Sequence, residues 1–289
     1  AVGRLPLLVL LVLASVPLVT PLRVILRLLG DVIQFFRRVP LAEFLFAPEW
    51  TPLFAEPRYG IAPLLAGTFL VTAIALFVAV PLGLALAVYV SEYLPSDKRA
   101  RVLGVLELFE GIPTVVFGYF ALLFVTPLLQ KVIPGLSLFN PLSAGLVMGF
   151  AILPYVSNVA ADAMQSVPRS IREAAYALGA RPYEVALKVV LPAALSGVIA
   201  AIILAASRAI GETMIVAIAA GQRPTLTLDP RETIATMTSY IVQAATGDQP
   251  TGSTAYYALF AVGFTLFLLT LALNVLAQYI VERYRERYE

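Results

Sequence analysis

The sequence contains no cysteine and no histidine, and charged residues make up only 13% of its 289 positions. These absences exclude disulfides, thiol nucleophiles, Ser-His-Asp triads and most transition-metal sites. We therefore expect no catalytic residue and no metal ligand in this chain. A loop of the G-x-x-x-x-G-K-[ST] type is also missing, which excludes ATP binding by that route, so we do not expect an enzyme.

Hydrophobic residues supply 60% of the sequence, compared with roughly 45–50% in soluble domains. They are gathered into runs long enough to cross a bilayer, which needs about 20 apolar residues. We predict an all-α integral membrane protein with about six transmembrane helices, at Leu5–Leu22, Ile61–Leu94, Gly111–Ile133, Pro141–Ala161, Ala193–Ala220 and Tyr256–Val281. The net charge of +2 comes without a dense Lys/Arg block, so nucleic acid is not an expected partner.

The predicted organisation has three parts. Residues 1–60 hold a first transmembrane helix, interpreted as a retained helix and not a signal peptide, followed by an extracytoplasmic or interfacial segment. That segment is rich in aromatic residues, which favour the headgroup zone: Phe35, Phe36, Phe44, Phe46, Trp50 and Phe54. Residues 61–282 form a transmembrane core of five helices, with a cytoplasmic loop at 168–192. Residues 283–289 form a cytoplasmic tail.

The distribution of Lys and Arg between the two sides predicts the orientation. One side, which includes both termini and the Arg169–Lys188 loop, carries eleven of these residues and the other carries eight. The positive-inside rule therefore places both termini and this loop in the cytoplasm of a multi-pass protein of the cell membrane.

The 168–192 loop contains signals for two short helices. Ser170 followed by Glu173 fits a capping box that would begin a helix. Gly179 suits a left-handed helix end, and Pro182 suits the first turn of a second helix. The expected structure is a pair of short helices joined by a rigid turn on the cytoplasmic side. Either it docks into a partner protein, or it is an ordinary capped loop helix.

The loop also resembles a known motif. Glu173-Ala174-Ala175, then Gly179, then Leu191-Pro192 after Val189-Val190 has the spacing of the EAA motif of ABC-importer permeases, with Val189 where Ile is usual. The resemblance implies a type I importer permease fold. It also implies that Glu173, Ala174, Ala175, Gly179, Leu191 and Pro192 form the coupling helix that docks into an ATPase subunit.

Charged residues interrupt the fifth apolar run at Arg208 and Glu212. A charge at the bilayer centre costs roughly 2.5–3.5 kcal/mol on insertion scales, so such residues face the protein interior or a water-filled path. Being one helical turn apart, the two can pair and simply neutralise each other or clamp a neighbouring helix. Alternatively, the Arg208 guanidinium binds an oxyanion on a translocation path. In that case Glu212 could accept a hydrogen bond from a protonated phosphate, which sulfate cannot offer.

Three stretches are similar to segments of the phosphate-importer permeases: Tyr59–Thr68, Glu107–Gly118 and Arg208–Met214, the last looking more like the PstC subunit than its PstA sibling. Thr114 and Phe117 stand where Ser and Tyr are expected. The resemblance implies phosphate import by alternating access, with a substrate path at Arg208, Glu212, Thr213 and Thr114.

The same resemblance implies the assembly. The expected partners are a second homologous permease, two ATPase subunits that bind ATP and Mg, an extracytoplasmic phosphate-binding protein, and membrane lipid. The chain itself is expected to bind no cofactor. Three alternatives remain open: a permease for another oxyanion such as molybdate or sulfate, an ion-coupled secondary transporter, and a membrane scaffold that transports nothing.

Overall fold

The protein is built from helices. The computed structural model describes residues 4–284, and within them the extended backbone is limited to one isolated bridge between Trp50 and Tyr59. The all-α prediction is confirmed. The helices are α1 (Arg4–Phe36), α2 (Leu41–Phe46), α3 (Ala62–Val88), α4 (Ser96–Glu110), α5 (Thr114–Phe120), α6 (Thr126–Gln130), α7 (Pro141–Gln165), α8 (Arg169–Ala177), α9 (Pro182–Glu184), α10 (Leu191–Ala193), α11 (Leu195–Gly211), α12 (Met214–Ala219), α13 (Met237–Thr246) and α14 (Thr254–Tyr284).

Three segments have the wider turn of a π-helix, and each continues an α-helix without a break in the chain. They are η1 (Tyr89–Tyr93), η2 (Ala121–Val125) and η3 (Val185–Val190). Such segments are short and are frequent at functional sites. Here η1 closes the long α3 helix and η3 joins α9 to α10.

The helices that can cross a membrane agree with five of the six predicted runs. Ala62–Tyr93, Pro141–Gln165 and Thr254–Arg283 are long and apolar enough to span. Two further runs become bent pairs, with 77° between Asp97–Glu110 and Thr114–Gln130 and 73° between Pro182–Ala193 and Leu195–Gly211. The predicted third span therefore does not start as one straight helix at Gly111. Instead the chain turns at residues 111–113.

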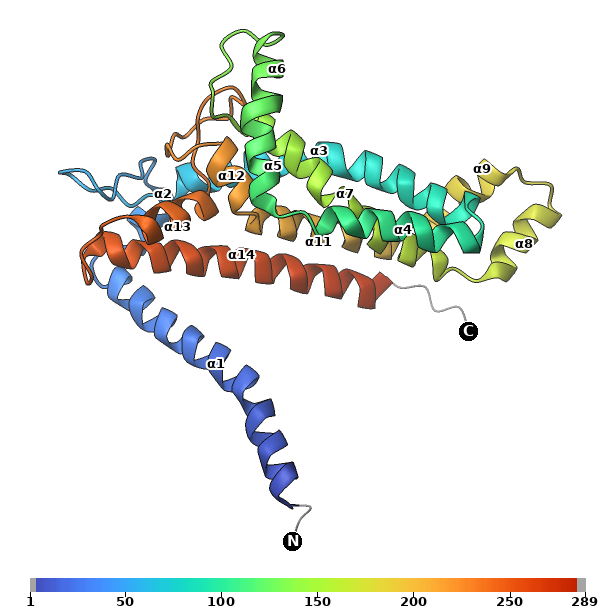
Figure 1. The fold of residues 1–289 in the computed structure, drawn as a ribbon, viewed down its shortest axis with the longest axis horizontal. Coiled ribbons are helices and arrows are strands. Elements are labelled where there is room, and N and C mark those ends of the chain that lie inside the picture. The colour runs from blue at the N-terminus through green and yellow to red at the C-terminus, as the bar shows by residue number, and fades with distance from the viewer. Residues whose placement is uncertain (1–3, 285–289) are drawn as a thin grey trace.

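Four helices run alongside one another and form the body of the bundle: α3, α7, α11 and α14 (Figure 1). Close approach of α7 to α3 depends on Gly149, where an added Cβ would lie 2.7 Å from the carbonyl oxygen of Ala75. Small residues at helix contacts are how membrane helices pack without a hydrophobic driving force. The buried core between them includes Val71, Ala75 and Met148.

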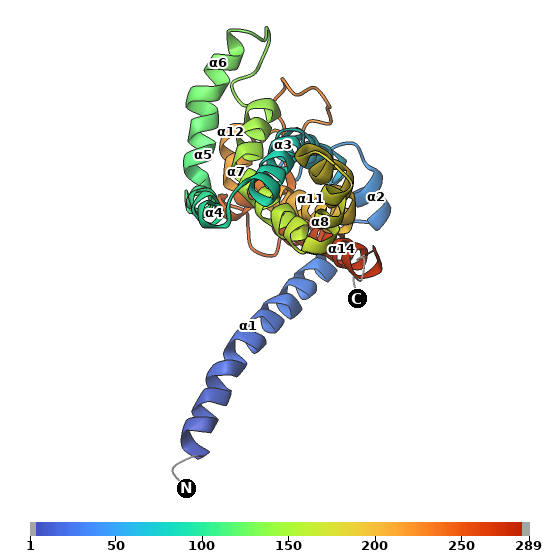
Figure 2. The same ribbon diagram turned by 90° about the vertical axis from the view of Figure 1, so that its right-hand side faces the viewer.

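The first helix is longer than predicted and leaves the bundle. The run expected to end near Leu22 continues to Phe36 as a single helix, whose C-terminal part packs against α14. Figures 1 and 2 both show α1 diverging from the other helices toward its N-terminus. Part of the segment assigned to an interfacial loop is therefore helix.

The aromatic residues before α3 divide into two groups. Phe35, Phe44 and Trp50 are buried, and their rings meet edge to face, while Phe46 and Phe54 are 81% and 72% exposed. Trp50 also meets the ring of Tyr240 from α13 at 4.9 Å between centroids. Burial raises the pKa of the Tyr240 hydroxyl. The cluster thus fixes the loop to the bundle, and the prediction of a headgroup location suits only Phe46 and Phe54.

Candidate functional site

The 168–192 loop lies at one end of the bundle, opposite α2, α12 and α13 (Figure 1). Its first helix, α8, begins at Arg169 with Pro168 as the preceding residue, and no side chain caps it. The predicted capping box is therefore wrong, because Ser170 lies inside the first helical turn. The extended backbone of Pro168 ends the preceding turn and sets the start of the helix.

The end of α8 confirms the prediction for Gly179. This residue has φ of +83°, in the left-handed region that favours glycine. The Gly179 N–H donates to Tyr176 O at 2.9 Å, and the Ala180 N–H donates to Ala175 O at 3.1 Å. These two bonds form a Schellman motif, which satisfies the last carbonyl groups of the helix.

The second segment begins at Pro182, as predicted, and runs to Ala193 through η3. The Glu184 carboxylate accepts a hydrogen bond from the Arg181 N–H at 3.1 Å and one from Lys188 Nζ at 3.0 Å. A side chain reaching back to the residue before the helix is half of a capping box. The start of this segment is thereby fixed relative to Gly179.

The residues matched to the EAA motif divide between two faces of the loop. Glu173, Ala174 and Pro192 are exposed, whereas Ala175 and Leu191 pack against a buried cluster that includes Val185. Leu178 was not singled out by the sequence reasoning, yet its side chain is 91% exposed. Leu178 follows Ala174 by one helical turn and lies on the same exposed side of the loop. The exposed face is thus the one available to a partner.

A charged junction that the sequence did not predict ties this loop to the membrane helices. Arg172 of α8 donates from Nε and Nη2 to the two oxygens of Glu92 in η1, at 3.0 and 2.9 Å. The side chains of Arg172 and Glu92 are only 17% and 6% exposed. Such a two-pronged pair adds geometric specificity as well as energy. Because the partners are 80 residues apart, sequence spacing gave no indication of it.

Further hydrogen bonds extend the junction to α7 and α4. Arg172 also donates to the carbonyl oxygens of Val167 and Met164, the latter at 2.8 Å. Arg99 at the start of α4 donates to the carbonyl oxygens of Val90 and Ser91 at 2.9 and 2.7 Å. Four segments of the chain therefore meet at one set of charges.

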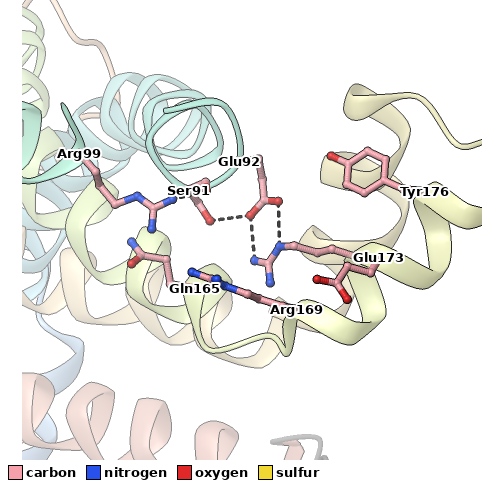
Figure 3. A pocket seen from close by; sticks show the side chains of 8 residues that line it. Ser91, Glu92, Arg99, Gln165, Arg169, Glu173 and Tyr176 are labelled. Atoms are coloured by element: carbon pink, nitrogen blue, oxygen red, sulfur yellow. Dashed lines mark hydrogen bonds and ion pairs between the residues drawn. The ribbon is translucent and has the colours of Figure 1, made fainter. Parts of the chain in front are cut away.

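A polar cavity of about 470 Å³ opens at this junction (Figure 3). Its lining is entirely polar or charged: Ser91, Glu92, Arg99, Gln165, Arg169, Arg172, Glu173 and Tyr176. Figure 3 shows Arg99, Gln165 and Arg169 toward one side, with Glu173 and Tyr176 toward the other. Within residues 4–284, no group of three or more acidic residues is placed to hold a metal ion.

The predicted substrate residues lie where the fifth span breaks. Helix α11 ends at Gly211 and α12 begins at Met214, leaving Glu212 and Thr213 outside both helices. Glu212 Oε1 accepts hydrogen bonds from the N–H groups of Met214 and Ile215 at 3.1 and 3.4 Å. The backbone carbonyl of Glu212 accepts from the Thr238 hydroxyl at 2.8 Å. Side-chain and backbone atoms of Glu212 thus satisfy the polar groups that the break frees.

Arg208 does not form the expected ion pair with Glu212. None of the ion pairs within residues 4–284 includes Arg208, and its guanidinium instead lies over the ring of Tyr155 on α7, 5.3 Å from the ring centre. The Arg208 side chain is exposed in the single chain. A cation over an aromatic face is held in place without losing its charge. Mutual neutralisation with Glu212 is therefore wrong, whereas the contact with Tyr155 on α7 fits the alternative that Arg208 clamps a neighbouring helix.

Thr114 lies on a helix that packs directly against α12. Helix α5 approaches α12 at Gly118, where an added Cβ would lie 3.1 Å from the carbonyl oxygen of Met214. Thr114 and Thr213, which are distant in the sequence, therefore belong to neighbouring elements, and both are half-buried. Their contact with a substrate stays a prediction.

Comparison with known proteins identifies the family. Residues 79–286 match the model of the "binding-protein-dependent transport system inner membrane component". The chain belongs to this family. It is 33% identical to the probable ABC transporter permease protein YqgH of Bacillus subtilis (strain 168), over 83% of the chain and 78% of the relative. It is 30% identical to the phosphate transport system permease protein PstC of Mesorhizobium japonicum, with the same coverage.

Solved structures agree on the fold of this inner membrane component. A bacterial ABC transporter involved in the import of the acidic polysaccharide alginate matches with a TM-score of 0.61 at 16% identity. The match covers 95% of this chain and 96% of that one. The type I importer permease fold implied by the EAA resemblance is thus confirmed.

We expect Arg172 and Glu92 to be energetically coupled, so that the stability each one contributes depends on the presence of the other. Arg172→Gln or Glu92→Gln alone should each lower the free energy of unfolding by about 3 kcal/mol, because one buried charge is left unpaired. The double substitution should cost less than the sum of the two. Thermal unfolding of the detergent-purified chain and its three variants measures this coupling. Strictly additive losses would contradict the interaction.

We expect Gly179→Val to weaken the hydrogen bonds of the turn after α8 by straining the backbone, and not by a side-chain clash. Nothing lies within 4 Å of an added Cβ at this position, but a β-branched residue strongly disfavours a positive φ. The Ala180 amide, which bonds to Ala175, should therefore exchange its hydrogen faster with solvent. Gly179→Asn is the matched control and should stay near the wild type, because Asn tolerates this conformation. Equal exchange in Gly179→Val and the wild type would refute the assignment.

Proposed function

We propose that this chain is the PstC-type transmembrane subunit of a phosphate importer driven by a separate ATPase. The observation that carries the proposal is the exposed Arg208 guanidinium at the break of a membrane helix. A charge at that depth must face protein or water, and in a permease the water-filled path is the place that suits it. The planar donors of a guanidinium match phosphate oxygens. Several relatives that share the family are themselves phosphate transport permeases.

The broken helix supports a role for Glu212 in selecting the anion. Only Oε1 of Glu212 is engaged by the backbone of α12, so Oε2 remains available to accept a hydrogen bond. Monohydrogen phosphate carries such a donor at neutral pH, while sulfate does not. The carboxylate would therefore repel an anion that brings no proton and accept one that does.

The coupling end supports the assembly that the proposal requires. Glu173, Ala174 and Leu178 form an exposed face on a turn fixed by Gly179. We infer that this face and the exposed Pro192, with Ala175 and Leu191 packed behind them, dock into an ATPase subunit on the cytoplasmic side. ATP and Mg then bind to that subunit. A second permease completes the path, an extracytoplasmic binding protein delivers the phosphate, and both termini of this chain face the cytoplasm.

The Arg208 prediction is tested by phosphate uptake. Arg208→Ala should lower ATP-dependent uptake about ten-fold to a hundred-fold, since it removes charge-assisted hydrogen bonds to the anion. Arg208→Lys should retain part of the activity, because lysine keeps the positive charge but lacks the planar N–H donors of the guanidinium group. Uptake into cells at matched membrane levels of the protein is the measurement, with Arg101→Ala, an exposed arginine of α4, as control. Normal uptake by Arg208→Ala would exclude an anion site there.

The Glu212 prediction concerns preference rather than rate. Glu212→Gln should narrow the preference for phosphate over sulfate by roughly ten-fold, because the amide no longer repels a fully deprotonated anion. Competition of sulfate and molybdate against labelled phosphate measures the change. Glu232→Gln, in the loop after α12, is the matched substitution outside the break and should leave competition unaltered. If Glu212→Gln keeps the wild-type preference for phosphate over sulfate, Glu212 plays no part in choosing the anion.

A further inference from the structure

The cavity at the charged junction contains hydrogen-bond donors that the protein itself does not satisfy. Arg172 is fully engaged by Glu92 and by two backbone carbonyl oxygens. Arg169, in contrast, has neither an ion pair nor a hydrogen bond within residues 4–284. The amide nitrogen of Gln165 is buried and has no acceptor. Both side chains line the same cavity.

The cavity also has a surplus of positive charge. Three arginines and two glutamates line it. Glu92 is paired with Arg172, and Arg99 is held by backbone carbonyl oxygens alone, without a carboxylate partner. The remaining carboxylate, Glu173, is exposed, as is Arg169, whereas Arg99 is half-buried. Two guanidinium groups and a buried amide nitrogen therefore converge on a space of about 470 Å³ that far exceeds the volume of one water molecule.

We propose that this cavity is an oxyanion site that takes a phosphate group, either free inorganic phosphate or the headgroup of an anionic lipid. Arginine forks are the usual ligands for phosphate oxygens, and a buried donor without an acceptor is costly unless a ligand supplies one. Both sources of phosphate can reach the cavity, because it lies beside the last residues of the Ala62–Tyr93 span. The ligand bridges Arg169 of α8 and Arg99 of α4, and so braces the coupling loop against the bundle.

This site is separate from the one at Arg208. Helix α11 begins at Leu195, directly after the coupling segment, and Arg208 lies thirteen residues further along. No residue of α11 lines the cavity, and on α7 the ring beneath Arg208 (Tyr155) and the cavity residue Gln165 are ten residues apart, about 15 Å at 1.5 Å per residue. The oxyanion site therefore does not depend on which substrate passes Arg208.

The experiment uses the absence of cysteine from the chain. A fluorophore on Ser166→Cys, an exposed position next to Gln165 and outside the docking face of α8, reports on the cavity in the complete transporter, with partner-subunit cysteines removed. In the first arm, inorganic phosphate is added to transporter in phosphatidylcholine nanodiscs, against chloride at matched ionic strength. In the second arm, phosphate is omitted and the nanodiscs contain increasing phosphatidylglycerol.

We expect a saturable change in fluorescence in at least one arm, and the arm that responds identifies the source. Arg169→Gln should weaken the response about ten-fold or more, because it removes a charged donor. Gln165→Leu should also weaken the fluorescence response. Because this substitution changes no charge, such a result excludes an effect that arises only from long-range electrostatics. Arg181→Gln, an exposed arginine of the same loop outside the cavity, should not weaken the response.

Two results would overturn the proposal: no saturable response in either arm, or equal weakening by Arg181→Gln and Arg169→Gln. Arg208→Ala separates this site from the transport function. It should leave the fluorescence titration unchanged whether or not it lowers uptake. A normal titration together with normal uptake in that variant would contradict only the assignment of Arg208.

Discussion

The two-pronged ion pair between Arg172 and Glu92 is the interaction on which the cytoplasmic end of this protein depends. It joins a short surface helix to the end of the apolar Ala62–Tyr93 span, and the other donors of Arg172 reach the end of α7. Either charge alone would be destabilising in so buried a position, since an unpaired buried charge costs several kcal/mol. The loop can therefore move only together with the helices it is tied to. Such an arrangement suits a part that receives force from a partner.

The other end of the molecule solves a related problem with fewer charges. The break between α11 and α12 frees backbone donors and acceptors within an apolar helix pair, where unsatisfied groups are costly. Glu212 and Thr238 satisfy them, which leaves Arg208 free to lie over Tyr155. Both ends thus use ionisable side chains to fix irregular backbone, and guanidinium groups without a carboxylate partner within residues 4–284 remain at each end: Arg99 and Arg169 at one, Arg208 at the other.

The sequence predicted the features that depend on local chemistry or on the bilayer. Apolar runs located the spanning helices because only a helix satisfies its own backbone in lipid. Gly179 marked a left-handed turn because few other residues tolerate one, and Pro182 marked the next helix start. The EAA spacing identified the loop, and the structure showed which of its residues face outward.

Features that arise from tertiary placement were missed. The chain bends at residues 111–113, just where the third apolar run was expected to begin, and breaks at residues 212–213 inside the fifth run. Composition does not reveal a break whose polar groups are satisfied elsewhere in the fold. Helical spacing allowed an Arg208–Glu212 pair as one alternative, and the pair does not form because the helix ends between the two residues. Glu92 and Arg172 looked like ordinary charges at the ends of a run and a loop. Only the meeting of α3, α7 and α8 makes them partners.

The π-helical segment η1 has a consequence for how Glu92 is aimed. An α-helix turns by about 100° for each residue, and the wider turn of Tyr89–Tyr93 accommodates one residue more than a regular turn would. If that extra residue were taken up elsewhere in the helix, Glu92 would rotate by about this angle and lose Arg172. The wide turn and the ion pair therefore depend on each other. Together they give the end of α3 one preferred rotation about the helix axis.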